Sequence, residues 1–330
     1  MSRNVVITSI GSHTGGQIAK LLLSDGHFKR KVSSVTGLTL YPEIDSVKEV
    51  ADLGAKIVEH KPGNLDEVVA TLKETGADAI LLLPPGHKDS YNITLELIEA
   101  TKKANIPNVC FISSAGCDLA ERDKQPLLRS VIDLEAKVLE TKGDASTETG
   151  HSPVVIRRGF HAENLLLYSK HAQEEGVLPI PIGKDHKFAP MSMGDVAQVA
   201  AHVLSGHGKH GFDDKHRGQL MVLTGPLLTT GDELATAASK ALGEELKFKD
   251  VSEDEARHLL KDEAGRAEGE IAYLLEYFSL VREGKTNYIS TTAFHDVTGK
   301  HPQQPEDFFK AYAEELHPKR SNKRRKVEKK

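Results

Sequence analysis

The sequence is poor in the residues that mark secreted, zinc-binding and membrane-spanning proteins. It has no tryptophan and only two cysteines, Cys110 and Cys117, which are too few for a disulfide framework and are not spaced as a zinc site. No apolar run approaches roughly eighteen residues, and no basic start precedes an apolar stretch, so we expect neither membrane spanning nor secretion. The net charge of −5 gives no general attraction to nucleic acid or to membranes. These absences favour a protein of the reducing cytoplasm.

The order of apolar patterns predicts an α/β protein. At 330 residues the chain is long enough for one large α/β domain with a smaller lobe. In its first half, short β-rich runs alternate with amphipathic helices, which is typical of a parallel sheet covered on both faces. We predict strands at residues 5–8, 31–40, 56–59, 79–83, 108–114 and 154–158. The expected fold is therefore a Rossmann-type doubly wound parallel sheet.

The regular alternation ends at Gly159. Beyond it we predict helices at residues 195–204, 231–242, 253–260 and 306–315, and a Gly/Pro turn at residues 178–183. We expect a Rossmann domain over residues 1–158 and an α-rich C-terminal substrate lobe over residues 159–317, with some return to the sheet. Residues 318–330 are predicted to form a disordered basic tail.

The first strand leads through small residues into a helix, as in many dinucleotide sites. In such sites small residues let the backbone approach a pyrophosphate, and the amides at the helix N-terminus attract its negative charge. When Thr8 is aligned with the threonine that precedes the usual glycines, Ser9 and Ser12 occupy glycine positions and only Gly16 keeps its place. The serines can accept a phosphate if their φ angles are negative, whereas a position that needs positive φ would cost roughly 1–2 kcal/mol or move the loop. The residues predicted to bind the cofactor here are Thr8, Gly11, Ser12, Thr14 and Gly16, with Pro84 after the fourth strand.

Several segments resemble the NmrA-like family of atypical short-chain dehydrogenase/reductases. They are residues 155–165, 191–197, 223–226 and 297–308, and the resemblance covers about residues 4–316. It implies an NAD(P)-binding Rossmann domain, with NADP(H) preferred over NAD(H). Some members of the family resemble redox-sensing regulators, and others, including ergot-alkaloid reductases of the festuclavine dehydrogenase type, reduce small molecules with NADPH.

The resemblance also assigns individual residues. Asn64 matches an aspartate that borders the adenine in the family, although a surface turn explains it equally well. After residues 32–35 the chain has Thr36-Gly37, neither an acid for NAD nor an arginine for NADP. His161, where the family usually has an apolar residue, and Asn164 are expected to contact the substrate in a cleft between the two lobes. A partly exposed histidine at a helix start is the alternative for His161.

The catalytic residues are predicted from the usual tyrosine and lysine of a short-chain dehydrogenase. Lys137 occupies the lysine position, and Asp133 stands where the tyrosine would be. Lys137 could bind the nicotinamide ribose or donate a proton, together with Ser113 or Ser114 at the end of the fifth strand. Alternatively, Asp133 and Lys137 form an i,i+4 ion pair on an exposed helix face, worth about 0.3–0.5 kcal/mol.

Eight of the last twelve residues are basic. Lys323-Arg324-Arg325-Lys326 resembles a cluster that nuclear import receptors bind, or it is only a solubilising end. No metal is expected, because His207, His210 and His216 lie in a predicted exposed loop, and no pattern for direct DNA recognition accompanies the tail. Overall function is predicted to be NADP(H)-dependent oxidation or reduction of an apolar small molecule. The alternatives are an NADP(H)-sensing regulator acting through a protein partner, and a scaffold that binds no nucleotide.

Overall fold

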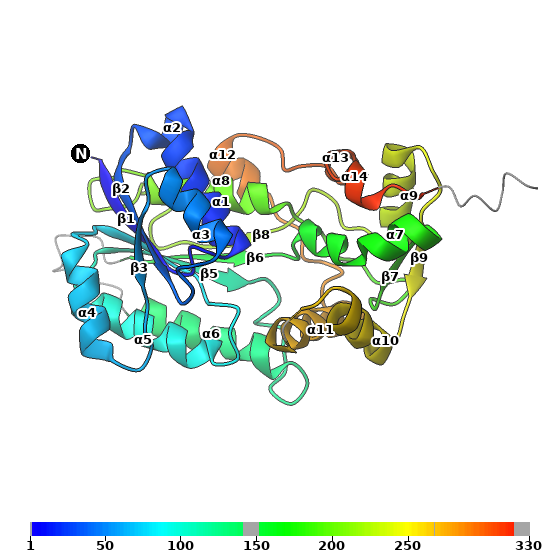
Figure 1. Cartoon of the computed structure of the whole chain (residues 1–330), viewed down its shortest axis with the longest axis horizontal. Helices are drawn as coiled ribbons and strands as arrows, with labels where there is room; N and C mark the ends of the chain where they lie inside the picture. Colours follow the sequence, from blue (N-terminus) through cyan, green and yellow to red (C-terminus); the bar gives the residue numbers. More distant parts are fainter. Residues whose placement is uncertain (1, 141–151, 267, 320–330) are drawn as a thin grey trace, which may run out of the picture. The chain divides into compact units, whose positions relative to one another are not determined.

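The computed structural model describes residues 2–140, 152–266 and 268–319 (Figure 1). The chain divides into two compact units. Unit 1 consists of Met1–Arg158, Met193–Leu223 and Thr291–His301, and unit 2 of Gly159–Ser192, Thr224–Ser290 and Pro302–Lys330. The first boundary therefore follows Arg158, and two later segments return to unit 1. Within the described residues, no helix has both the length and the apolar character needed to cross a membrane.

Unit 1 contains a seven-stranded sheet with the strand order β3-β2-β1-β4-β5-β6-β8. The strands are β1 Arg3–Ile7, β2 Val32–Thr39, β3 Lys56–Glu59, β4 Ala79–Leu82, β5 Asn108–Ser114, β6 Val154–Arg158 and β8 Leu220–Leu223. All neighbouring pairs are parallel. The strand order reverses between β1 and β4, so the fold is the predicted Rossmann-like α/β fold, and the reversal marks the edge at which such sheets bind ligands.

Helices cover both faces of this sheet (Figure 1). They are α1 His13–Ser24, α2 Gly26–Lys29, α3 Asp45–Asp52, α4 Leu65–Glu74, α5 Ser90–Lys103, α6 Pro126–Leu139, α8 Met193–Leu204 and α12 Ala293–Thr298. Helices α4, α5 and α6 share a core with Val6, Ile80 and Phe111 of the central strands. Helix α1 packs against α3 and α8 on the other face. Because both faces are buried, the central strands are apolar throughout rather than alternating.

Unit 2 is mostly helical and has a two-stranded parallel sheet of β7 and β9. Its elements are η1 Ala162–Tyr168, α7 Ser169–Glu175, β7 Val177–Ile180, α9 Gly231–Leu242, β9 Lys247–Asp250, α10 Glu253–His258, η2 Leu259–Glu263, α11 Glu268–Arg282, α13 Pro305–Ala311 and α14 Ala313–Leu316. An aromatic core surrounds Phe160, whose ring centroid lies 5.2 Å from that of Phe188 and 5.5 Å from that of Phe278.

Several elements differ from the sequence prediction, and three of them have a clear physical reason. β7 replaces part of the predicted Gly/Pro turn, because a strand with only one neighbour can place Pro179 where no amide is required. The 15-residue helix α11 was not predicted, since its buried positions leave no clear apolar stripe. Strand β8 was also missed. Its four residues, Leu-Met-Val-Leu, form an apolar run that is too short to distinguish a strand from a buried helix segment, and only Leu223 is buried.

One segment of the family resemblance has a direct steric explanation. Gly225 follows Thr224 in the segment 223–226, and its amide donates to the Ala189 carbonyl at 3.2 Å. A Cβ atom at Gly225 would overlap the Pro190 carbonyl oxygen. Only glycine allows the two backbones to approach this closely.

Candidate functional site

The candidate site is the loop between β1 and α1, at the carboxyl end of the sheet where the strand order reverses. Thr8 joins this loop to the end of β4: its amide donates to the Leu81 carbonyl at 3.0 Å, and its Oγ1 accepts from the Leu83 amide at 2.7 Å. The same hydroxyl donates to the Leu83 carbonyl at 3.1 Å. Thr8 is buried, and its hydroxyl already donates one hydrogen bond and accepts another. It therefore holds the predicted cofactor loop in position rather than binding the cofactor with its hydroxyl.

Ser9 has the backbone conformation that the usual glycine would have. Its φ is +51°, in the left-handed region, and its hydroxyl donates to the Leu83 carbonyl at 2.9 Å. Ser12 instead has a φ of −71°, which any residue adopts. The loop therefore keeps the shape of a glycine-rich turn, with strain at Ser9 that the hydrogen bond to Leu83 partly offsets.

The close approach of helix to loop occurs at Gly15. A Cβ atom there would lie 2.5 Å from the Ser9 carbonyl oxygen, whereas one at Gly16 would make an ordinary 3.5 Å contact with the Ile10 carbonyl oxygen. The alignment that left Gly16 as the one retained glycine is therefore wrong. Counting intervals of three residues from Ser9 and Ser12 leads to Gly15, so the sequence contained this signal.

The N-terminus of α1 presents hydrogen-bond donors that the protein does not use. Ser12 caps the helix, and its Oγ accepts from the Gly15 amide at 3.1 Å, which leaves the Ser12 O–H available as a donor. The backbone amides of Gly11, His13 and Thr14 donate to no acceptor among the described residues. Free amides at a helix N-terminus, with the helix dipole behind them, favour an anion.

Beside this loop lies the segment that follows β2. Because β2 continues to Thr39, the residues Thr36-Gly37 lie inside the strand and not at the position that selects the cofactor, which corrects the sequence interpretation. That position is held by Leu40 and Tyr41, neither of them charged, and Tyr41 is 54% exposed. The carbonyl of Gly11 accepts a 2.8 Å hydrogen bond from Ser46, so α3 holds the loop from this side.

Asn64 and Pro84 lie in the loops that follow β3 and β4, two strands that are separated in the sheet by β2 and β1. Asn64 caps α4: its Oδ1 accepts from the Glu67 amide at 3.4 Å, and its Nδ2 donates to the Glu67 carboxylate at 3.2 Å. This favours the alternative interpretation of Asn64 as a helix-capping surface residue. Pro84 follows the end of β4 directly after Leu83, the residue to which Thr8 and Ser9 are bonded.

The structure does not bring Lys137 and Ser114 together. Lys137 is 45% exposed and its Nζ lies 3.0 Å from the Glu140 carboxylate, whereas Ser114 is buried at the end of β5. Asp133 pairs with Arg122 at 3.1 Å rather than with Lys137. Lys137 thus lies on an exposed helix face, as the alternative stated, but with a different acidic partner. These positions give no support for proton transfer between Lys137 and Ser114.

The residue of α6 that does face β5 is Glu135. It stands two positions before Lys137, which is about 200° around a helix of 3.6 residues per turn. Its carboxylate accepts 2.8 Å hydrogen bonds from both Nε and Nη2 of Arg157, and a further bond from the hydroxyl of Ser113. Ser113 and Arg157 are register partners on β5 and β6. Sequence reasoning missed this network, although Glu135 falls on the apolar stripe of its helix.

The Glu135 network also sets the state of a nearby thiol. Burial, and then the charge of Glu135, raises the pKa of Cys117 to about 12. The pKa of Arg157 is raised as well, mainly by its hydrogen bond to Glu135. The network therefore consists of a permanent ion pair beside a neutral thiol, which is neither a nucleophile nor a redox centre at neutral pH.

The remaining predicted residues lie in unit 2 or outside the described residues. His161 is buried at the start of η1, its backbone paired with Met191, so it is not the partly exposed histidine of the alternative. The backbone amide of Asn164 donates to the backbone carbonyl of His161 at 3.0 Å. The substrate cleft between the lobes stays a prediction. The basic cluster at residues 323–326 lies outside the described residues, so nuclear import stays a prediction too.

The three histidines of the predicted exposed loop differ in burial. His216 is buried rather than exposed, which corrects the prediction for that residue. No group of three or more His, Cys, Asp or Glu side chains in the described ranges could hold a metal ion.

The chain is similar in sequence to several curated proteins. No protein-family model matches it. It is 30% identical over 188 residues to Prestalk A differentiation protein A of Dictyostelium discoideum, a match that covers 57% of this chain and 59% of that protein's length. It is 25% identical over 264 residues to NAD(P)H azoreductase of Xenophilus azovorans, covering 79% of this chain and 85% of that protein.

A solved structure agrees on the fold. The NADPH complex of the quinone oxidoreductase QOR2 from Escherichia coli superposes with a TM-score of 0.73 at 20% sequence identity, covering 93% of this chain and 99% of that one. At this identity the likeness shows the Rossmann-like fold alone. The sequence relatives also include Quinone oxidoreductase 2 of Escherichia coli, 26% identical over 204 residues, so two of the curated relatives are reductases by name.

Proposed function

We propose that this protein is an NAD(P)H-dependent oxidoreductase of the NmrA-like type, and that the β1–α1 loop holds the pyrophosphate of the cofactor. The observation that carries the proposal is the set of unused donors at the start of α1: the amides of Gly11, His13 and Thr14, and the hydroxyl of Ser12. They lie where the strand order reverses, which is where Rossmann-type sheets bind dinucleotides. The similarity to an NAD(P)H azoreductase supports the same assignment.

The loop fits the cofactor despite its serines. Ser9 reproduces the left-handed turn, and Gly15 allows the helix to approach it. Ser12 has no steric conflict and adds a hydroxyl that can donate to a phosphate oxygen. Its bond to the Gly15 amide fixes the side chain in place, so a phosphate would meet a donor that is already oriented.

We propose NADP(H) as the preferred cofactor, with NAD(H) second. The preference rests on the family resemblance, because Leu40 and Tyr41 carry no charge for or against a 2′-phosphate. An acidic residue at that position would have opposed the phosphate, and none is there.

The substrate class that we propose is an apolar small molecule with an electrophilic group, such as a quinone or an azo compound. The bound nicotinamide supplies a hydride to such an acceptor. Since Lys137 is exposed and bonded to Glu140, we assign the accompanying proton to solvent and give Lys137 no catalytic role.

The first experiment is calorimetric titration of NADPH, NADP, NADH and NAD into the full chain and into Ser12→Asp. Aspartate caps a helix as well as serine does, so α1 keeps its cap, but the added negative charge opposes the pyrophosphate. We expect Ser12→Asp to weaken NADPH binding by about tenfold or more, which is about 1.4 kcal/mol per factor of ten.

The matched control is Ser252→Asp in unit 2. Ser252 caps α10 with the same 3.1 Å bond to the third amide of its helix, but it lies outside the β1–α1 loop. The Ser252→Asp variant should bind NADPH as tightly as the wild type does. Equal weakening in both variants, or no nucleotide binding by the wild type, would overturn the cofactor assignment. Turnover is then measured as NADPH oxidation in the presence of a quinone or an azo dye, and binding without turnover of either would remove the enzymatic part.

A further inference from the structure

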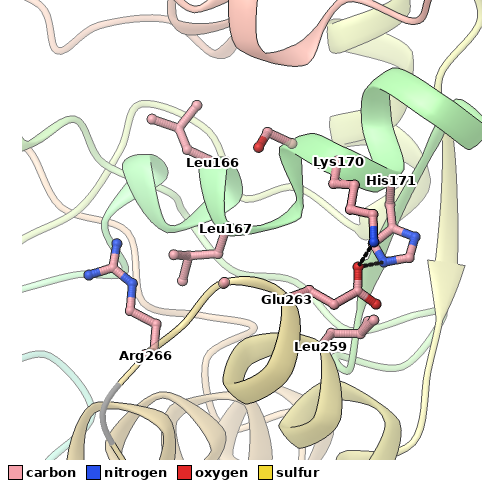
Figure 2. Close-up of a pocket in the computed structure, with 9 residues that line it drawn as sticks. Leu166, Leu167, Lys170, His171, Leu259, Glu263 and Arg266 are labelled. Carbon is pink, nitrogen blue, oxygen red and sulfur yellow. Dashed lines mark hydrogen bonds and ion pairs between the residues drawn. The ribbon is translucent and has the colours of Figure 1, made fainter.

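Unit 2 contains a pocket of about 260 Å³ that the proposed cofactor site does not involve. One wall is the junction of η1 and α7, and the other is the helical segment around η2 (Figure 2). Its apolar surface is made by Leu166, Leu167, Leu259 and Ala264. The pocket is open to solvent and its lining is more polar than apolar, so it suits a small ligand of about two fused rings that keeps one face in water.

A π turn builds one wall of the pocket. The Ala264 amide donates to the Leu259 carbonyl at 3.1 Å, five residues back, and η2 is wider than an α-helix as a result. In such a turn the residues four and five positions after Leu259 both lie one turn further along the helix, on the same side as Leu259. Glu263 and Ala264 therefore line the same pocket as Leu259. π turns are frequent at functional sites.

The ionisable side chains at one end of the pocket are paired with one another. The carboxylate of Glu263 lies 2.8 Å from Nζ of Lys170 and 3.3 Å from Nε2 of His171, as the dashed lines in Figure 2 show. Nδ1 of His171 lies 3.0 Å from Glu175. The hydrogen bond between Lys170 and Glu263 raises the pKa of the lysine and lowers that of the carboxyl, so both remain charged. At this end Lys170 is therefore already paired and is not available to an anionic ligand.

Arg266 differs from these residues in having only a long ion pair among the described residues. It forms no side-chain hydrogen bond within the described residues, and its ion pair with Glu270 is long, at 3.7 Å. In Figure 2 its side chain lies on the opposite side of the view from the Lys170, His171 and Glu263 group. A guanidinium presents five donors in a planar fork that matches a carboxylate.

We propose that this pocket binds a small organic acid with an apolar body, the carboxylate at Arg266 and the ring system against Leu167 and Leu259. The site lies wholly within unit 2, and its argument uses no residue of the nucleotide loop. It therefore goes beyond the proposed oxidoreductase function and stands or falls separately from it.

The test is titration of 2-naphthoate into the full chain without nucleotide, compared with the neutral 2-naphthamide. The chain has no tryptophan, so the emission of the naphthyl group can be followed against a low protein background. We expect saturable binding of naphthoate that is about tenfold tighter than that of the amide, because a charge-assisted bidentate bond is stronger than a neutral one.

Three variants assign the binding to the pocket. Arg266→Gln should lose the preference for the acid, and Ala264→Phe should fill the pocket and weaken both ligands. Arg257→Gln is the matched control: Arg257 belongs to α10, pairs with Glu268 and does not line the pocket, so its binding should remain that of the wild type. Absence of saturable binding, equal affinity for acid and amide, or an unchanged preference in Arg266→Gln would each overturn the proposal.

Discussion

The replacement Arg157→Met should destabilise unit 1 far more than the loss of an exposed ion pair does. The guanidinium of Arg157 donates 2.8 Å hydrogen bonds to both oxygens of Glu135, and the Glu135 side chain is only 4% exposed. Methionine keeps the apolar length of the side chain but leaves the buried carboxylate with the hydroxyl of Ser113 as its remaining strong donor. The second partner of Arg157, Asp118, is 50% exposed and can be solvated by water.

The expected magnitude follows from the burial of Glu135. Removing one partner of a buried ion pair costs about 3–5 kcal/mol, because the other charge stays in the interior without compensation. For a folding unit of 150–250 residues each kcal/mol lowers Tm by roughly 2–4 °C, so we expect a decrease of about 10 °C. The double replacement Glu135→Met with Arg157→Met removes both charges and should recover most of this loss.

The assay is thermal and urea unfolding followed by circular dichroism at neutral pH. The matched control is Arg122→Met, which breaks the 3.1 Å pair with Asp133 on the same helix α6. Those side chains are 66% and 36% exposed, so their pair should contribute less than about 1 kcal/mol. A loss of under 1 kcal/mol in Arg157→Met, or equal losses in both single variants, would refute the claim that burial makes the Glu135 pair costly to break.

Three further predictions concern other groups of unit 1. Burial, and then the charge of His27, lowers the pKa of His202 to about 4; its unfolded state therefore binds the proton first, so stability should fall as pH drops from about 6.5 toward 4, and His202→Gln should show a smaller fall in unfolding titrations. At Ser9, where φ is positive, the Ser9→Gly variant should be more stable than Ser9→Ala, whereas at the helical control Ser130 the Ser130→Gly variant should be less stable than Ser130→Ala. The same order of stability at both positions in urea unfolding would contradict the left-handed conformation of Ser9. Cys117, with its pKa raised to about 12, should resist maleimide in the native state and react after unfolding, and rapid native labelling in mass spectrometry would argue against its burial.

The sheet was the most predictable part of this protein. The predicted strands at residues 56–59, 108–114 and 154–158 have the bounds of β3, β5 and β6. For β5 and β6 the reason is that strands inside a parallel sheet are buried and read as apolar runs. β3 is an edge strand whose residues are exposed or partly buried, so this reason does not apply to it. The strands β7, β8 and β9 were missed. β7 and β8 are apolar but only four residues long, which does not distinguish a strand from a buried helix segment, and β9 has a single apolar residue. Their pairing joins segments far apart in the chain, and nothing in a local window encodes it.

The site was predictable in place but not in detail. The strand, the small-residue turn and the helix of residues 5–23 located the loop at the end of β1. Which residues of that loop are strained, and which touch, depended on the backbone conformation that β4 imposes through Thr8 and Ser9. The misplacement of the close glycine at Gly16 rather than Gly15 came from alignment, and the packing of Gly15 on the Ser9 carbonyl corrected it.

The sequence by itself determined the alternating α/β order and the position of the loop at the carboxyl end of β1. Those features depend on periodicity and residue type, which are local. Only the tertiary structure decided that Glu135 rather than Lys137 faces β5, and that Arg157 neutralises it. Two positions along a helix separate a buried side chain from an exposed one, and the partner that makes burial of a charge tolerable comes from a strand more than twenty positions away.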